Sequence, residues 1–319
     1  MKDEGIEARY FRRFRRWKIT VVFLSVILVF VALFSITQGP VQISFMTVLK
    51  IMLKNVPFLS ELIEKSWLPV EEIIILQIRL PRVLAAMLVG SALAVAGTIF
   101  QGLFRNPMAD PYLIGVSAGA ALGASLAIGL GVGISLFGML NAIPIMAFIG
   151  ALITVFAVYN IAKIGSRVSP LTLLLGGITI STLLTAILSV IMINMGERLN
   201  ALIFWLLGGF SLSNWSQVNA ALPFIIVGII VICIFARDFN VLQLGEDQAQ
   251  QLGVNVEKLK RIILIFASLI TAAAVSISGI IGFVGLVIPH MTRMLVGVDH
   301  RILSPPSALA GAIILTLCD

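Results

Sequence analysis

Long apolar segments alternate with short polar ones along almost the whole chain. The apolar runs carry little charge and lie at 19–36, 83–101, 112–132, 142–162, 173–193, 220–236, 262–281, 282–297 and 306–319. An α-helix needs about 20 such residues to cross the hydrocarbon core of a bilayer. The pattern therefore predicts an all-α, polytopic membrane protein with roughly nine transmembrane helices in this chain.

Two segments depart from this regular pattern. The apolar stretch 201–210 is too short to cross a bilayer, so it is expected to be an interfacial segment or a partial helix. The last run stops at Asp319, close to its own end. A polytopic protein rarely finishes there, so a C-terminal hairpin is expected to be missing from the chain.

The basic residues indicate on which side of the membrane each loop lies. When the loops alternate from a cytoplasmic N-terminus, 16 of the 22 Lys and Arg residues fall inside and 6 fall outside. Cytoplasmic loops of membrane proteins carry such an excess. We therefore expect a multi-pass protein of the cytoplasmic membrane. Its basic cytoplasmic tail (1–18) contacts membrane lipid and precedes one transmembrane permease domain (19–319).

Composition excludes several classes of protein. Of the 319 residues, 59% are hydrophobic and 12% charged, against about 45–50% and about 25% in soluble proteins. A water-soluble enzyme is excluded. The sequence has no P-loop and no catalytic grouping, and its two cysteines and two histidines lack metal-ligand spacing. We expect no enzyme activity, no cofactor, no metal site and no nucleic-acid partner.

Two arginines flank a proline at the outer end of the second run, in the sequence Arg-Leu-Pro-Arg at 79–82. Pro81 suits the first turn of a helix, where its missing N–H costs nothing. Arg79 and Arg82 are three residues apart and can point in similar directions. They could snorkel to the membrane surface, or form a fork of donors for the carboxylates of a docking partner.

A turn bracketed by prolines follows the second run. Pro107 and Pro111 restrict the residues that precede them, Asn106 and Asp110, to extended conformations. These polar residues are therefore expected to lie outside the helices on the cytoplasmic side. The turn is either a stiff connector or part of a gate.

Glycine spacing predicts one packing face and one helix break. Gly115, Gly119 and Gly123 recur every four residues, which is typical of close helix–helix packing. The segment Ser278–Arg293 contains three clustered glycines, and Pro289 is expected to break its apolar run. Broken helices at membrane depth need neighbours that satisfy the freed backbone groups.

The stretch Arg237–Arg261 is a 25-residue polar loop on the cytoplasmic side. Its residues Glu246–Leu252 predict a short helix closed by Gly253 at the C′ position. Asn255 is expected to cap a second helix with Glu257 in its first turn. Two short helices bent at glycine form either an amphipathic linker on lipid or a docking surface for a soluble motor protein.

Six segments follow one another from residue 79 onward: RLPRVLAAMLVGSALAVAG, QGLFRNPMADP, LLLGGI, WLLGG, LGEDQAQQLGVN and GFVGLVIPHMTR. In this order they resemble the FecCD family of permeases, the membrane subunits of ABC importers for iron-siderophores, haem and cobalamin. The resemblance implies ten helices per subunit and a homodimer, or a heterodimer, with the path between its subunits. It also implies two partner ATPase subunits and an extracytoplasmic substrate-binding protein.

The resemblance also implies roles for individual residues. Arg79 and Arg82 would meet acidic residues of the binding protein. Two elements of a cytoplasmic gate are implied, with Met108 and Pro170 departing from the residue types usual there: Asn106 and Met108 in the first, Ser169 and Pro170 in the second. A helix pair in 244–256 would receive the ATPase stroke, through Leu244, Gly245, Glu246, Gln250, Leu252, Gly253 and Asn255.

The predicted function is the permease subunit of an ABC importer that translocates an iron-siderophore-type chelate, with ATP hydrolysed by a partner chain. The alternative is an ion-coupled secondary transporter of a small solute. That alternative requires an ion site, and the predicted membrane cores contain almost no ionisable residues. The expected helix breaks near 201–210 and 279–289 are the places where an ion site could lie.

Overall fold

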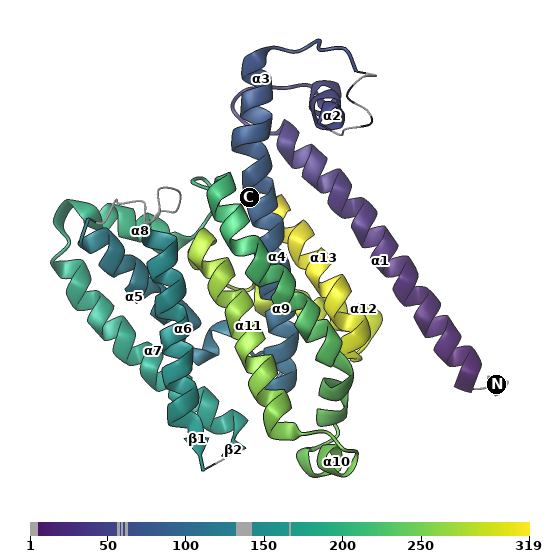
Figure 1. Cartoon of the computed structure of the whole chain (residues 1–319), viewed down its shortest axis with the longest axis vertical. Coiled ribbons are helices and arrows are strands. Elements are labelled where there is room, and N and C mark those ends of the chain that lie inside the picture. The colour runs from purple at the N-terminus through teal and green to yellow at the C-terminus, as the bar shows by residue number, and fades with distance from the viewer. Residues whose placement is uncertain (1–5, 56–57, 59, 61–62, 132–141, 166) are drawn as a thin grey trace.

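Helices run up and down along one axis through nearly the whole molecule (Figure 1). A computed structural model describes residues 6–55, 58, 60, 63–131, 142–165 and 167–319. In this part of the chain, seven helical segments are long and apolar enough to cross a membrane, and two shorter apolar helices accompany them. The predicted all-α, polytopic class is confirmed, with a helix count close to the one expected.

The apolar runs form α1 (Ile6–Thr37), α4 (Leu80–Leu103), α5 (Val116–Gly129), α6 (Ala142–Ala162), α7 (Pro170–Ile193), α9 (Trp215–Leu242), α11 (Val256–Ser278), α12 (Val284–Val296) and α13 (His300–Cys318). Short elements connect them: α2 (Phe45–Lys54), α3 (Pro69–Ile73), the π-helix η2 (Ile74–Arg79), the 3-10 helices η3 (Pro111–Ile114) and η4 (Gly196–Arg198), α8 (Leu199–Leu207) and α10 (Glu246–Gln251). The strands β1 (Lys163–Ile164) and β2 (Arg167–Val168) pair antiparallel.

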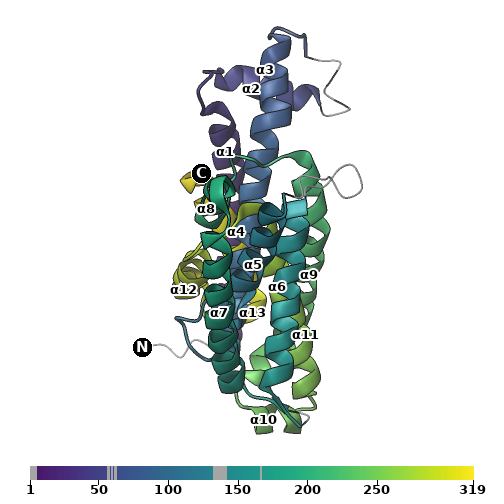
Figure 2. The same ribbon diagram turned by 90° about the vertical axis from the view of Figure 1, so that its left-hand side faces the viewer.

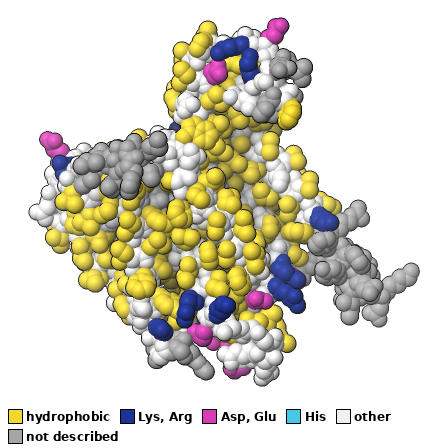
Figure 3. All heavy atoms as spheres, viewed as in Figure 1, with side chains coloured by type: hydrophobic (Ala, Val, Ile, Leu, Met, Phe, Trp, Pro, Cys, Tyr) yellow, Lys and Arg dark blue, Asp and Glu magenta, His cyan; other side chains and the backbone are white. Residues whose placement is uncertain are grey.

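The bundle has two distinct ends (Figure 1). One end, here called the α3 end, carries α2 and α3. The other, here called the α10 end, carries α10 and the β1–β2 hairpin. Hydrophobic side chains cover the middle of the face seen in Figure 3, and Lys and Arg gather along its lower edge at the α10 end. This distribution is typical of a membrane-spanning bundle.

α4 is the central helix of the bundle, because it packs against α1, α9, α11, α12 and α13. Glycines allow the close approaches. A Cβ added at Gly90 would overlap the backbone of Gly311 in α13, and one added at Gly97 would overlap Gly285 in α12. Small residues at such crossings let membrane helices gain dispersion contacts through their backbones.

α5, α6 and α7 pack against one another beside α4, and Figure 2 shows this group face-on. The predicted glycine face lies between α5 and α6, where a Cβ at Gly119 would overlap Thr154 and the carbonyl of Gly150. Gly123 lies equally close to the backbone of Met146. Close packing therefore explains these glycines, while Gly115 forms the left-handed turn between η3 and α5 with φ of 85°.

Pro81 lies in the first turn of α4, but the helix does not begin there. α3, η2 and α4 form one continuous helical segment over Pro69–Leu103. The Leu80 N–H bonds to the carbonyl of Ile75, five residues back, in the π-helical pattern. A proline within an α-helix clashes with the carbonyl four residues before it, and the wider π-turn accommodates the ring.

The expectation that Pro289 breaks the apolar run was wrong, because Pro289 lies inside α12. The break lies earlier, at 279–283, where Gly279 and Phe283 have φ of 68° and 67°. Pro289 cannot donate to the carbonyl of Gly285, and Gly97 of α4 has no side chain to obstruct that carbonyl. The ring is thus tolerated within the helix.

The short apolar stretch near 201–210, expected to be an interfacial segment or a partial helix, corresponds to α8, a nine-residue helix that packs against α5. The non-helical backbone between α11 and α12 finds hydrogen-bond partners on neighbouring elements, as such backbone requires when it lies within a membrane protein. Tyr112 donates its hydroxyl to the carbonyl of Ile281 at 2.9 Å, and the Gly209 N–H bonds to the carbonyl of Ser278 at 2.8 Å.

Candidate coupling and gate site

The α10 end carries the predicted bend and cap, but not the predicted pair of short helices in a loop over 237–261. α9 continues to Leu242, and the second helix is the 23-residue α11. α10 ends at Gln251, and Gly253 follows in the left-handed conformation with φ of 84°. The side chain of Asn255 accepts a hydrogen bond of 3.0 Å from the backbone N–H of Lys258 and so caps α11. This confirms the predicted bend at glycine and the predicted cap.

α10 is anchored through a buried alanine, and an exposed leucine flanks it at each end. Ala249 is fully buried, whereas Leu244 and Leu252 are 61% and 65% exposed. Gly245 and Gly253, both with positive φ, lie on either side of the helix. Exposed leucines on a polar loop form the kind of surface that binds another protein.

Lys260 connects this helix pair to the β1–β2 hairpin. Its ammonium forms an ion pair with Glu246 Oε1 of α10 at 2.7 Å and another with Glu257 Oε1 of α11 at 3.3 Å. It also donates to the carbonyl oxygen of Val168 in β2 at 3.2 Å. Glu257 Oε2 accepts the backbone N–H of Val168 at 3.2 Å, so two residues of α11 hold the end of β2.

Sequence reasoning missed Lys260, which it counted only among the basic loop residues. The spacing of Glu257 and Lys260, three residues apart on a helix, was the one available signal, since such pairs lie on one face. Glu246 and Val168 are brought to the same ammonium by tertiary folding alone.

The first predicted gate element lies in the loop between α4 and η3. The side chain of Asn106 accepts a hydrogen bond of 2.9 Å from the backbone N–H of Met108, whose own side chain is exposed. The preceding residue, Arg105, donates from Nη2 to the carbonyl of Leu242 at 3.3 Å. This segment is therefore tied to the end of α9, immediately before α10.

The second predicted gate element begins α7. Ser169 is the N-cap, with its carbonyl accepting from Leu173, and Pro170 is the first residue of the helix. Both residues directly follow β2, whose Val168 is held by Lys260 and Glu257.

A cavity of about 300 Å³ lies between the two predicted gate segments and α10. Its wall includes Arg105 beside the first predicted gate element, Pro170 of the second, and the ion pair of Glu246 and Lys260. The structure thus brings together three regions that are separated by about 60 to 140 positions in the sequence.

Asp110 links the proline-bracketed turn to η3. Its carboxylate accepts the backbone N–H of Tyr112 at 2.8 Å, and burial raises the pKa of Asp110 above its usual value. Because the Tyr112 hydroxyl also bonds to Ile281, this turn is fastened to the broken segment that precedes α12. These bonds are consistent with the stiff connector that was one of the two interpretations.

The two arginines near the α3 end bond to different elements rather than forming one fork. Arg79 is 8% exposed, and its guanidinium donates to the carbonyls of Ile36, Thr37 and Val41 at and beyond the end of α1. Arg82 is 40% exposed and pairs with Asp319, with Nε 2.7 Å from Oδ2. A role of these arginines in docking stays a prediction.

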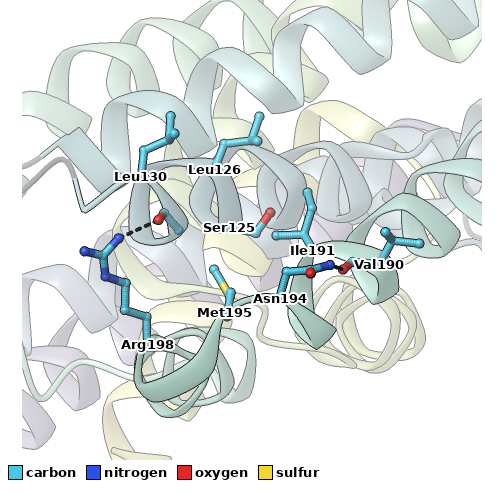
Figure 4. Close-up of a pocket in the computed structure, with 9 residues that line it drawn as sticks. Ser125, Leu126, Leu130, Val190, Ile191, Asn194, Met195 and Arg198 are labelled. Carbon is cyan, nitrogen blue, oxygen red and sulfur yellow. Dashed lines mark hydrogen bonds between the residues drawn. The ribbon is translucent and has the colours of Figure 1, made fainter.

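A second cavity of about 380 Å³ lies at the α3 end between α5, α7 and η4 (Figure 4). Leu126, Leu130, Val190 and Ile191 contribute apolar side chains to its wall. Arg198 lies at its edge and donates to the carbonyl of Gly129. This arginine therefore connects η4 to the end of α5.

Known proteins resemble this chain in sequence and in fold. Residues 27–319 match the FecCD transport family. The cobalamin import system permease protein BtuC of Halobacterium salinarum is 44% identical over 248 residues, which cover 78% of this chain and 66% of that protein. The hemin transport system permease protein HmuU of Yersinia pestis is 39% identical over 298 residues, covering 93% and 85%.

One solved structure is similar over most of its length. It is described as a metal-chelate type ABC transporter in an inward-facing conformation, and it is 32% identical, with a TM-score of 0.79 over 94% of this chain and 88% of that one. The sequence match, the fold and the apolar helices agree. This chain belongs to the FecCD transport family and is a multi-pass membrane permease of the ABC transporter type.

Proposed function

We propose that this chain is the permease subunit of an ABC importer that carries a metal chelate, with a ferric siderophore as its cargo. The relatives named above transport cobalamin and hemin, and an Fe(3+)-citrate permease, YfmE of Bacillus subtilis, is 33% identical. All three cargoes are metals held in an organic ligand. The observation that carries the proposal is the attachment of both gate segments to the loop around α10.

The α10 end is the cytoplasmic end in this proposal. Sixteen of the 22 basic residues then lie in cytoplasmic segments, including the N-terminal tail. The positive-inside rule supports this orientation, as do the Lys and Arg side chains along the lower edge in Figure 3.

Two ATPase subunits would dock at this end, one against each permease subunit. The exposed Leu244 and Leu252 supply apolar contact area, and Gln250 between them is also exposed. The glycines on either side let the short helix reorient as the ATPases close and reopen. ATP is bound and hydrolysed by the partner chains.

The gates would open because hydrogen bonds attach them to the segments around α10. A displacement of α10 would be transmitted to the second gate through β2, and a displacement of the end of α9 to the first gate through Arg105. The first gate comprises Asn106 and Met108, and the second comprises Ser169 and Pro170. The permease thereby alternates between outward- and inward-facing states without a high-affinity site of its own.

A substrate-binding protein would dock at the α3 end. Arg82 is the better placed of the two arginines, because 40% of its side chain is exposed. Arg79 would act indirectly by fixing the end of α1. A second copy of the chain would complete the path along α7, where Thr179, Thr182, Thr185 and Ser189 are exposed although their hydroxyls bond to carbonyls of their own helix.

Purification from the native membrane in mild detergent tests this function. The expected result is a P-loop ATPase in one-to-one ratio with the permease. Proteoliposomes of that complex would then be assayed with radiolabelled ferrichrome, ferric citrate, cyanocobalamin, haemin and molybdate, each with its binding protein. ATP-dependent uptake of ferrichrome supports the proposed cargo. Uptake without ATP would instead point to an ion-coupled secondary transporter.

A further inference from the structure

Lys260 is a buried cation shared by three elements of the α10 end. Only 5% of its side chain is exposed, whereas Glu246, its partner in α10, is 41% exposed. A lysine ammonium has three N–H donors. Glu246, Glu257 and the carbonyl of Val168 supply one acceptor for each of them.

A buried ammonium with three fitted acceptors holds its partners together firmly. An uncompensated charge is expensive to bury, so moving one partner away leaves a large penalty unless the other partners move as well. Lys258, two residues earlier in α11, has an exposed side chain. The chain therefore uses one specific lysine, rather than the general positive charge of the loop, at this junction.

The geometry also indicates which end of the linkage moves first and which follows. α10 lies between Gly245 and Gly253, which both have positive φ, and among the described residues a Cβ added at Gly253 would meet no atom within 4 Å. These two glycines are the positions at which the backbone could turn as the helix tilts. At the other end of the linkage, both backbone polar groups of Val168 bond to side chains of α11. The residues that follow are Ser169 and Pro170.

We propose that Lys260 is the positioning residue that couples α10 to the second gate, so that a tilt of α10 moves Val168 and the start of α7 with it. This inference rests on the proposed function, in which α10 receives the ATPase stroke. The first gate is attached separately, through Arg105 and Leu242. Loss of Lys260 therefore disconnects the second gate from α10, although Glu257 still holds the Val168 N–H, and leaves the first gate connected.

The variant that tests the linkage is Lys260→Met, which keeps most of the unbranched side chain and removes the ammonium with its charge. Lys260→Arg is the conservative rescue, since a guanidinium also reaches several acceptors. Lys258→Met is the matched control, because it removes the same charge from an exposed position two residues away. Glu246→Gln weakens only the α10 contact, and it serves as a second test in case Lys260→Met fails to fold.

Distances between spin labels report the linkage directly. Cys233 and Cys318 are both exposed, so they are replaced by Ala before labelling. Labels at Asp247 and Leu171, both exposed, measure α10 against the start of α7. Labels at Leu171 and Val298 measure the movement of that gate against the α12–α13 loop. The complex with its ATPases is measured without nucleotide and with Mg-ATP and vanadate, and ATP hydrolysis is assayed in parallel.

In the wild-type chain we expect a narrow distribution of distances between the labels at 247 and 171. The distance between the labels at 171 and 298 should change when nucleotide binds. Lys260→Met should broaden the 247–171 distance distribution and abolish most of the nucleotide-dependent shift of the 171–298 distance. ATP hydrolysis and assembly should persist. Lys260→Arg and Lys258→Met should resemble the wild type. A merely structural role would instead reduce assembly and hydrolysis together.

Besides that joint loss of assembly and hydrolysis, two further results would overturn the proposal, and they are distinguishable. If Lys260→Met and Glu246→Gln retain the narrow distribution and the full shift, Lys260 does not couple α10 to the gate while the importer function stands. If the wild-type complex binds no ATPase or shows no nucleotide-dependent shift, the proposed function fails and the coupling role fails with it.

Discussion

The indole N–H of Trp215 donates a hydrogen bond of 2.8 Å to the carbonyl oxygen of Leu76. This carbonyl lacks its usual partner within the helix, because the Leu80 N–H bonds to Ile75 and the next residue, Pro81, has no N–H. A side chain of α9 thus compensates for a proline in the long helical segment that contains α4.

Trp215→Phe should lower stability by about 1–3 kcal/mol, because the Leu76 carbonyl loses a donor. Thermal unfolding in detergent measures the change. Trp205→Phe, at another partly buried tryptophan, is the control and should have a smaller effect. Pro81→Ala restores a backbone donor, so the Trp215→Phe loss should shrink in that background, and an unchanged loss would contradict the compensation.

Arg79→Met should be more destabilising than Arg82→Met. Removing the Arg79 guanidinium leaves the carbonyls of Ile36, Thr37 and Val41 without their donor, a loss of about 2 kcal/mol or more. The pair of Arg82 with Asp319, in which 40% of the Arg82 side chain remains exposed, contributes less, about 1 kcal/mol. Thermal unfolding of both variants checks the order, and equal losses would argue against the capping of α1 by Arg79.

Gly119→Ala should lower the free energy of unfolding by about 1–3 kcal/mol. The added Cβ overlaps the backbone of α6 as well as Thr154, so α5 could not pack as closely on α6. Gly129→Ala adds the same atom near the flexible end of Met195, at 3.3 Å, and is the matched control. Thermal unfolding monitored by circular dichroism compares the stability of the two variants. A neutral Gly119→Ala would mean that the helices can move apart at no cost.

Gly253→Val should impair coupling, because a β-branched residue is strained at the φ of 84° that this bend requires. Gly253→Asn tolerates the left-handed region and should retain most of the activity. Nothing in the described structure obstructs either side chain within 4 Å of the Cβ position. The ratio of solute taken up to ATP hydrolysed is the measurement, and similar ratios for the two variants would exclude a conformational cause.

Asp299 should make the α10 end sensitive to acid. Burial alone would raise the pKa of Asp299, but hydrogen bonds from Arg301 and Asn240 outweigh it and lower the pKa below its usual value. A lowered pKa stabilises the fold above the unfolded-state value, about 3.9, and this contribution disappears as the pH falls through the folded-state pKa. Stability measured from pH 6 to pH 3 should therefore fall less steeply in Asp299→Asn than in the wild type.

Local features were predictable where neighbouring residues decide the conformation. The bend at Gly253 and the cap at Asn255 depend on a few adjacent residues, and both were predicted correctly. The helix break was misplaced at Pro289 because whether a proline is tolerated depends on the helix opposite, here Gly97 of α4. That contact joins positions almost 200 residues apart.

Side-chain partners across the bundle were beyond sequence reasoning for the same reason. The spacing of Arg79 and Arg82 suggested either snorkelling or one fork of donors, yet their acceptors lie 38 to 43 residues before Arg79 and 237 residues after Arg82. Lys260 looked like any other loop cation. Its partners could not be recognised before the hairpin, α10 and α11 were brought together.

The sequence by itself determined the membrane-spanning helices, the family and the local shape of the α10 loop, because apolar run length, motif order and turn residues act over short distances. Only the tertiary structure decided which polar groups share a site. Burial in a bundle forces each charge or freed carbonyl to find its partner on another helix, and the identity of that helix is set by packing.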